Sequence, residues 1–269
     1  MKKEKLLFNK YLVASFLIMI FMFFVSWIIE SGIIEMLFFF DVNAPDLEGN
    51  GVSIRNELIQ SCFNPVIVVY DMFTVTGPLI PLVTLVAMRG YFNIYDGYLM
   101  YYIGRDDYFG NVKKSIFKNS LIIAVYNFFA YFIVIFILSR FSESGKLFLD
   151  KTQSIHHFFD KDLFNNYNLL YFIVIGFISV FIVSLIMAIL IGGLYTLLKS
   201  KLKVSIIIIA YTYIFSLIGK IFGVKLIDIT FTIRSFDFFG PPFYELFVPL
   251  IIPTIIGGIL LFRKDIYEL

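Results

Sequence analysis

Six long apolar stretches follow one another along the chain, and polar or charged residues separate them. A membrane-spanning helix needs about 20 mostly apolar residues, so each stretch predicts one span. The predicted spans cover residues 11–29, 65–88, 121–138, 169–198, 204–227 and 247–262. The pattern predicts an all-α membrane protein with six transmembrane helices, in which residues 1–269 form a single transmembrane domain.

The composition supports a membrane protein and excludes other classes. Hydrophobic residues make up 59% of the 269 residues and charged residues 16%, whereas soluble domains average roughly 45–50% and about 25%. A soluble protein of this size could not bury so much apolar surface, and the chain is too apolar to be disordered. One cysteine excludes an internal disulfide framework, and two adjacent histidines exclude most histidine-built metal chemistry.

The placement of the charges predicts the orientation of the spans. Cytoplasmic loops carry the excess of Lys and Arg, and most of the 22 Lys and Arg residues fall in segments that share one side when the N-terminus is inside. The first outer loop has only Arg55 as a basic residue, beside six acidic ones. We therefore expect both termini to be cytoplasmic. This orientation predicts outer loops at residues 30–64, 139–168 and 228–246 and a large cytoplasmic loop at residues 89–120.

Few residues in the spans suggest chemistry. Asp71 lies inside the second predicted span, where an ionisable group is costly, so it is a candidate for a substrate or ion path; an interfacial aspartate is the alternative. His156 and His157 fit a solvated loop better than a metal site. The chain has no Walker A, G-x-S-x-G or H-E-x-x-H motif. We expect no catalytic residue, no metal site and no enzyme activity in this chain.

Small residues and prolines predict how the spans pack. A four-residue repeat of small side chains on the fourth span favours close internal packing over a dimer face, and prolines in the second and sixth spans predict kinks. The repeat consists of Gly176, Val180, Ser184, Ala188 and Gly192, and the kink sites are Gly77-Pro78, Pro81, Pro249 and Pro253. Segment 236–244, aromatic and broken by Gly-Pro-Pro, fits a re-entrant segment or an aromatic interface belt equally well.

The cytoplasmic loop alternates aromatic and charged residues. It is too polar to span a membrane and too apolar to be freely solvated. This composition is typical of a short amphipathic helix, either docked in a partner's groove or lying on the membrane surface. Its central part reads Tyr101-Tyr102-Ile103-Gly104-Arg105-Asp106-Asp107-Tyr108-Phe109 and leads through Lys113-Lys114 into the third span.

With these residues and this topology, the chain resembles the permease subunits of ABC-2 type exporters of Gram-positive bacteria. The likeness includes small permeases associated with bacteriocin or lantibiotic immunity and peptide export. In that family the loop holds the coupling helix that docks on the nucleotide-binding subunit. The resemblance implies that the docking residues are Tyr101, Tyr102, Arg105, Tyr108, Phe109 and Lys113. The family often has further basic residues after the arginine, where this chain has Asp106 and Asp107.

The resemblance implies an ABC-2 (type V) exporter fold in the cell membrane of a Gram-positive bacterium. Two permease subunits, identical or related, would pair with two ATPase subunits that hold ATP and magnesium, so this chain would need no cofactor. The cargo would be hydrophobic or amphipathic: a peptide, an antimicrobial or a lipid-like molecule. No nucleic-acid partner is expected. The alternative is a stand-alone membrane immunity protein that sequesters a toxin without ATP.

Overall fold

The structure is a computed structural model, and it describes residues 9–47, 49–97, 99–102, 108–141, 168–234 and 243–262. These residues form helices and turns and no strand, which confirms the predicted all-α class. Six helical segments are long and apolar enough to cross a membrane, which confirms the predicted number of spans. They are Lys10–Glu30, Pro65–Gly97, Tyr108–Ser139, Phe172–Leu198, Lys201–Phe222 and Tyr244–Phe262.

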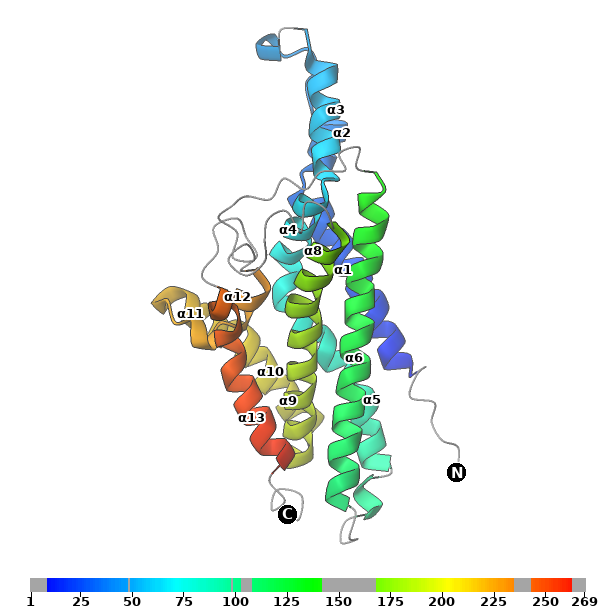
Figure 1. Ribbon diagram of the computed structural model, residues 1–269, viewed down its shortest axis with the longest axis vertical. Helices are drawn as coiled ribbons and strands as arrows, with labels where there is room; N and C mark the ends of the chain where they lie inside the picture. Colours follow the sequence, from blue (N-terminus) through cyan, green and yellow to red (C-terminus); the bar gives the residue numbers. More distant parts are fainter. Residues whose placement is uncertain are drawn as a thin grey trace.

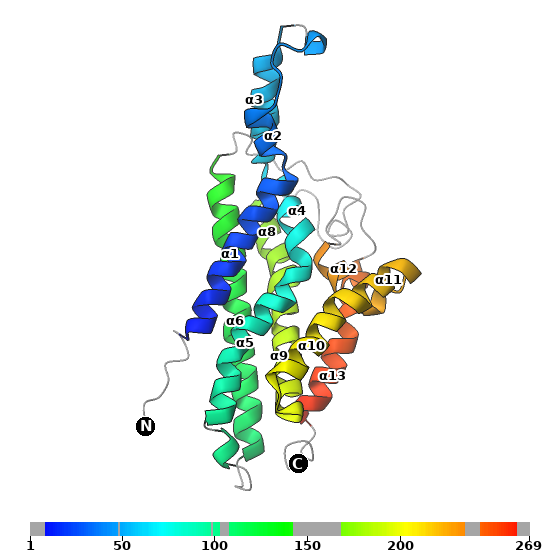
Figure 2. The same ribbon diagram turned by 180° about the vertical axis from the view of Figure 1, so that it is seen from behind.

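Several spans are built from more than one helix. The principal helices are α1 (Lys10–Glu30), α4 (Pro65–Thr76), α5 (Ile80–Gly97), α6 (Tyr108–Ser139), α8 (Asn168–Gly176), α9 (Val183–Leu198), α10 (Lys201–Ile209), α11 (Ser216–Phe222) and α13 (Ile251–Phe262). The helices outside the spans are α2 (Ile33–Phe38), α3 (Gly51–Cys62) and α12 (Ile229–Arg234). Figures 1 and 2 show an elongated bundle, from which α2 and α3 project side by side at one end.

Polar side chains cap the N-terminal ends of three spans. The Asn9 side chain accepts a hydrogen bond from the Tyr11 amide before α1. The Asn64 side chain does the same for the amide of Val66 before α4, whose first residue is a proline. Capping side chains satisfy amides that have no partner within the helix, and proline is well suited to the first helical position. Ser200 caps α10 in the same way.

Helix α9 lies at the centre of the bundle, in contact with α5, α6 and α13, while α1 packs against α4, α5 and α6. The small residues of the four-residue repeat are buried in this contact region. A side chain at Gly176 would come within 2.2 Å of the Tyr131 ring, and one at Gly192 within 2.9 Å of Ile116. The repeat therefore serves internal packing, as predicted, because glycine lets α6 approach the fourth span closely.

A proline interrupts the second span, as predicted. In the last span, the helix continues through one of the two prolines. A 3₁₀ turn at Gly77–Leu79 separates α4 from α5, which confirms the interruption predicted at Pro78. In the last span, Pro249 falls in a 3₁₀ segment, Phe243–Leu250, and Pro253 lies in the first turn of α13. A proline amide is not needed in a first turn, so α13 continues through Pro253.

Two predicted boundaries need correction, and one predicted loop contains helices. The segment 89–120, predicted as a loop, is mostly helical in its described parts, because α5 continues to Gly97 and α6 begins at Tyr108. The segment 30–64, also predicted as a loop, contains the helical hairpin of α2 and α3. The fifth span ends at Phe222 rather than near residue 227. Gly223 follows with a φ of 67°, the left-handed conformation with which glycine ends a helix.

Candidate functional site

The described residues of the predicted docking group lie in the turn after α5 and in the first turns of α6, at the end of the bundle opposite α2 and α3 (Figure 1). Tyr101, in the 3₁₀ turn Leu99–Tyr102, exposes 77% of its surface. Tyr102 belongs to the same turn, and Arg105 falls outside the described residues. Phe109 packs against the core. The Tyr101 ring is therefore accessible on the surface, whereas the Phe109 ring is not fully so.

Tyr108 differs from the expectation that its ring faces a partner. It is buried, and its hydroxyl lies 3.0 Å from the hydroxyl of Tyr95 on α5. The Tyr95 ring in turn meets the Tyr195 ring of α9 edge-to-face, with centroids 5.7 Å apart. One helical turn before Tyr95, the hydroxyl of Tyr91 lies 3.1 Å from the hydroxyl of Thr196. Tyr108 therefore packs within the protein and ties α6 to α5.

A polar cluster continues this contact to α9 and α10. The Tyr195 hydroxyl donates to both carboxylate oxygens of Asp96, at 2.6 and 2.8 Å. The Lys201 ammonium lies 3.3 Å from the same carboxylate and donates to Asn93 at 3.2 Å. The Phe92 ring stacks on Tyr195 with centroids 4.0 Å apart. We call Tyr95, Asp96, Tyr108, Tyr195 and Lys201 the inner cluster. It joins four helices directly beside the α5–α6 connection.

Charges differ between the two ends of the bundle. The end that carries the inner cluster is basic, and Asp96 is the one acidic residue among the described parts of 89–120 and 199–203. At the α2–α3 end, the described parts of segment 30–64 are acidic and hold Arg55 as their basic residue, and Arg140 follows α6 nearby. The basic residues at the first end are Arg89, Lys113, Lys114, Lys118, Lys199, Lys201 and Lys203. The acidic residues at the other are Glu30, Glu35, Asp41, Asp46 and Glu57.

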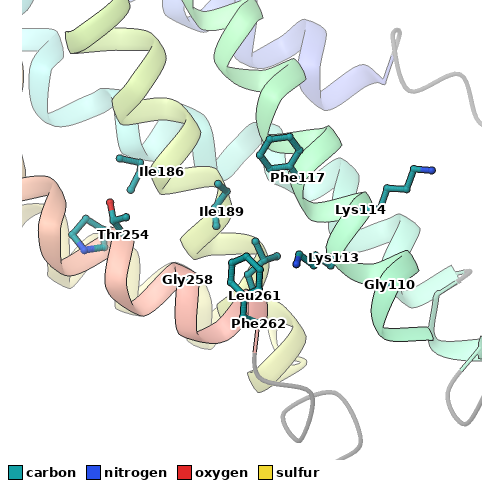
Figure 3. Close-up of a pocket in the computed structure, with 11 residues that line it drawn as sticks. Gly110, Lys113, Lys114, Phe117, Ile186, Ile189, Thr254, Gly258, Leu261 and Phe262 are labelled. Carbon is teal, nitrogen blue, oxygen red and sulfur yellow. The ribbon is translucent and has the colours of Figure 1, made fainter. Parts of the chain in front are cut away.

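A groove with a volume of about 530 Å³ opens between α6, α9 and α13 at the basic end. Its walls are almost wholly apolar, and Lys113 is at one end of it. Figure 3 shows Lys113 pointing toward Phe262 and Lys114 pointing away from the groove. The residues that line it are Gly110, Lys113, Lys114, Phe117, Ile186, Ile189, Pro253, Thr254, Gly258, Leu261 and Phe262.

Asp71, the predicted path residue, is buried in α4 with 3% of its surface exposed. Its Oδ2 atom has no hydrogen-bond partner among the described residues. The neighbouring backbone is well fixed, because the Ser26 hydroxyl of α1 donates to the Asp71 carbonyl at 2.6 Å. A buried acceptor without a partner costs free energy. Asp71 is thus a buried polar group rather than a solvated interfacial one.

A second buried polar cluster escaped the sequence analysis. The Asn127 amide of α6 donates to the Ser184 hydroxyl of α9 at 2.9 Å and lies 3.4 Å from the Thr84 hydroxyl of α5. All three side chains are fully buried. Such bonds hold spans together inside a membrane. Asn127 interrupts an apolar run, and this was the signal in the sequence.

The inner cluster also escaped the sequence analysis, although the spacing between its member Tyr95 and the neighbouring Tyr91 carried a signal. Tyr91 and Tyr95 are four residues apart, which places both rings on one face of a helix. The partners Tyr195 and Lys201 lie about 100 residues away in the chain. Only the fold brings them together.

Other candidate sites hold little chemistry. The Cys62 thiol is buried and donates to the carbonyls of Ser31 and Leu58 at 3.2 and 3.3 Å. Burial, and secondly the charge of Asp71, raises the pKa of this thiol. His156 and His157 lie outside the described residues. Within the described parts of the chain, no three metal-ligating side chains come together.

None of the protein-family models, curated proteins or solved structures compared with this chain matches it.

Proposed function

We propose that this chain is the permease subunit of an ABC-2 type exporter in the cell membrane of a Gram-positive bacterium. It moves a hydrophobic or amphipathic substrate, such as a peptide, an antimicrobial or a lipid-like molecule. Two permease subunits, identical or related, pair with two ATPase subunits that bind ATP and magnesium. The permease itself carries out no bond chemistry.

The observation that carries this proposal is the link between the α5–α6 connection and the rest of the bundle. The inner cluster joins the ends of α5 and α6 to Tyr195 on α9 and Lys201 on α10. A force applied to the connection therefore reaches spans that are distant in the sequence. A transporter driven by a separate ATPase needs such a link between its docking segment and its spans.

The unequal charge of the two ends supports an orientation with the inner cluster in the cytoplasm. Single cysteines at Asn50 and Ser200, in a chain without Cys62, test it with a thiol reagent that does not cross membranes. Position 50 should react on intact cells, and position 200 only after permeabilisation. Labelling of position 200 from outside would overturn the orientation.

The exposed Tyr101 ring offers the cleanest test of docking. The full chain should co-purify from its native membrane with an ATPase that has a Walker A motif. Truncating an aromatic anchor costs about 2 kcal/mol or more, so Tyr101→Ala should weaken co-purification about tenfold or more. Phe38→Ala is the matched control, because it removes a 76% exposed ring at the opposite end. If both variants retain the ATPase, the docking assignment is wrong.

Arg105 and Asp71 extend the test to docking chemistry and to the substrate path. Arginine can bind a carboxylate with two parallel hydrogen bonds and lysine cannot, so Arg105→Lys should weaken docking less than Arg105→Ala. Asp71→Asn should lower transport in vesicles while the ATPase still co-purifies. Unchanged transport would remove Asp71 from the path.

One observation favours the alternative of a stand-alone immunity protein that binds a toxin. The α2–α3 hairpin projects beyond the bundle (Figures 1 and 2), and Phe38 and Phe39 on it are more than three-quarters exposed. Exposed apolar residues of this kind often mark binding surfaces. Resistance that persists in cells without the partner ATPase, and is lost in Phe38→Ala, would favour this alternative.

A further inference from the structure

The groove between α6, α9 and α13 has one charged end and one apolar end. Its apolar walls include Ile186 and Ile189 of α9 and Leu261 of α13, and Lys113 is at the end nearest to Phe262 (Figure 3). Thr254 and Lys113 contribute its polar side chains, while Lys114 lines it at the edge and points away. The volume of about 530 Å³ falls within the roughly 300–1,000 Å³ of ligand pockets. The shape suits a molecule with a charged head and an apolar tail.

Two neighbouring glycines in α13 shape this groove. A side chain at Gly257 would lie 3.3 Å from Ile189, so this glycine allows α13 to pack on α9. A side chain at Gly258 would meet nothing within 4 Å. The missing side chain at Gly258 therefore leaves the groove open.

Lys113 is held at the groove without a negative partner. Its ammonium lies 3.7 Å from the centre of the Phe262 ring, a cation–π contact. Among the described residues neither Lys113 nor Lys114 forms an ion pair. The cation is thus positioned but not neutralised by the described parts of the protein.

The position of Lys113 along α6 corresponds to the headgroup level of a membrane. The apolar part of α6 begins at Leu121, eight residues further on, which is about 12 Å at 1.5 Å per residue. The groove extends from Lys113 and Phe262 to Ile186 and Thr254, which lie further into the spans (Figure 3). Basic pockets between spans at this level are suited to anionic lipid headgroups.

We propose that the groove binds an anionic phospholipid from the leaflet at the basic end of the bundle. The phosphate lies against Lys113, and one acyl chain lies along Ile186, Ile189 and Leu261. The described walls offer few groups for pairing with a peptide backbone, which disfavours a peptide occupant. This inference requires only that the chain spans a membrane and does not depend on the exporter assignment.

The test uses the full chain reconstituted with equal amounts of phosphatidylglycerol and phosphatidylcholine, then released into mild detergent for native mass spectrometry. The native chain should retain phosphatidylglycerol in preference to phosphatidylcholine. Lys113→Gln should lower phosphatidylglycerol retention about fivefold, the factor that corresponds to about 1 kcal/mol for one basic residue near an anionic surface. Lys118→Gln is the matched control on the same helix, because Lys118 does not line the groove, and it should retain the lipid.

The acyl chain is tested separately from the headgroup. Gly258→Leu should fill the groove and abolish retention, and Gly258→Ala should reduce it less. In the unaltered chain, phosphatidylglycerol with a photoreactive group in its acyl chain should label residues 186–189 or 254–262, whether or not the variants fold.

Four results would overturn the proposal. One is equal retention of the two lipids by the native chain. Another is undiminished retention in Lys113→Gln. The third is full displacement by soluble glycerophosphoglycerol, which would show a phosphate site without a place for the tail. Photolabelling confined to other segments would also contradict the assigned groove.

Discussion

Removing the hydroxyl of Tyr195 should loosen the inner cluster without disturbing its packing. Tyr195→Phe keeps the ring that stacks on Phe92 and deletes the donor that reaches both oxygens of Asp96, at 2.6 and 2.8 Å. A hydrogen bond to a charged group contributes about 1.5–3 kcal/mol. The Asp96 side chain is 42% exposed, so water replaces part of the lost bond. We expect a loss of about 1 kcal/mol in the free energy of unfolding.

The assay is unfolding of the full chain in bicelles by titration with a denaturing detergent, followed by a double-mutant cycle. Tyr195→Phe and Asp96→Asn should couple by most of that value, because the two residues share one interaction. Lys201→Gln should cost less, about 0–1 kcal/mol, and its effect should shrink in high salt, because its ion pair with Asp96 is half-exposed.

Tyr213→Phe is the matched control, since Tyr213 is 40% exposed and lies away from the inner cluster. This control should stay within about 0.5 kcal/mol of the native chain. The reasoning fails if Tyr195→Phe is as stable as the control, or if Tyr195→Phe and Asp96→Asn are additive. Under the proposed function, Tyr195→Phe should also lower transport per ATP hydrolysed while docking of the ATPase remains normal.

Three further predictions concern packing and reactivity. Gly176→Ala should destabilise the protein by about 1–2 kcal/mol, because its new methyl group overlaps a buried ring, whereas Gly258→Ala should be neutral or stabilising because it meets open space; detergent titration of both variants checks the opposite signs. Ser184→Ala should cost about 0.6–1.7 kcal/mol, because it leaves the buried Asn127 amide without its shortest partner; an unchanged unfolding curve would contradict this. Burial raises the pKa of the Cys62 thiol, and the thiolate is the reactive form. Maleimide should therefore react about tenfold or more slowly with the folded chain than with the unfolded chain at neutral pH, and the folded-state rate should keep rising above the ordinary thiol pKa of about 8.5. Equal rates in the two states would refute it.

The pattern of residues along the chain was sufficient to predict the spans and some of the packing between them. A bilayer imposes one local requirement on each span, namely about 20 apolar residues in a helix, and this requirement is visible in any stretch taken alone. The four-residue repeat from Gly176 to Gly192 was informative for the same reason, because its spacing places small residues on one helix face. Pro78 revealed the interruption in the second span, since a proline lacks the amide that continues the helix.

The helix boundaries and the buried side chains at the basic end were harder to predict from the sequence. The segment 89–97 carries enough polar residues to be taken for a loop, yet it continues α5 because its aromatic face packs on α9. Tyr108 was expected to face a partner, and it is buried against Tyr95 instead. An aromatic residue beside charges has the same appearance in a sequence whether its ring faces solvent or the core.

By itself, the sequence determined the all-helical class, the six spans and the unequal charge of the two sides, because each follows from residues that are neighbours in the chain. The tertiary structure alone decided the inner cluster, the Asn127 contacts and the groove beside Lys113. Each of these joins side chains from three or more helices, and Asp96 and Tyr195 are 99 positions apart. Their meeting depends on how the helices pack against one another, which no local pattern in the chain specifies.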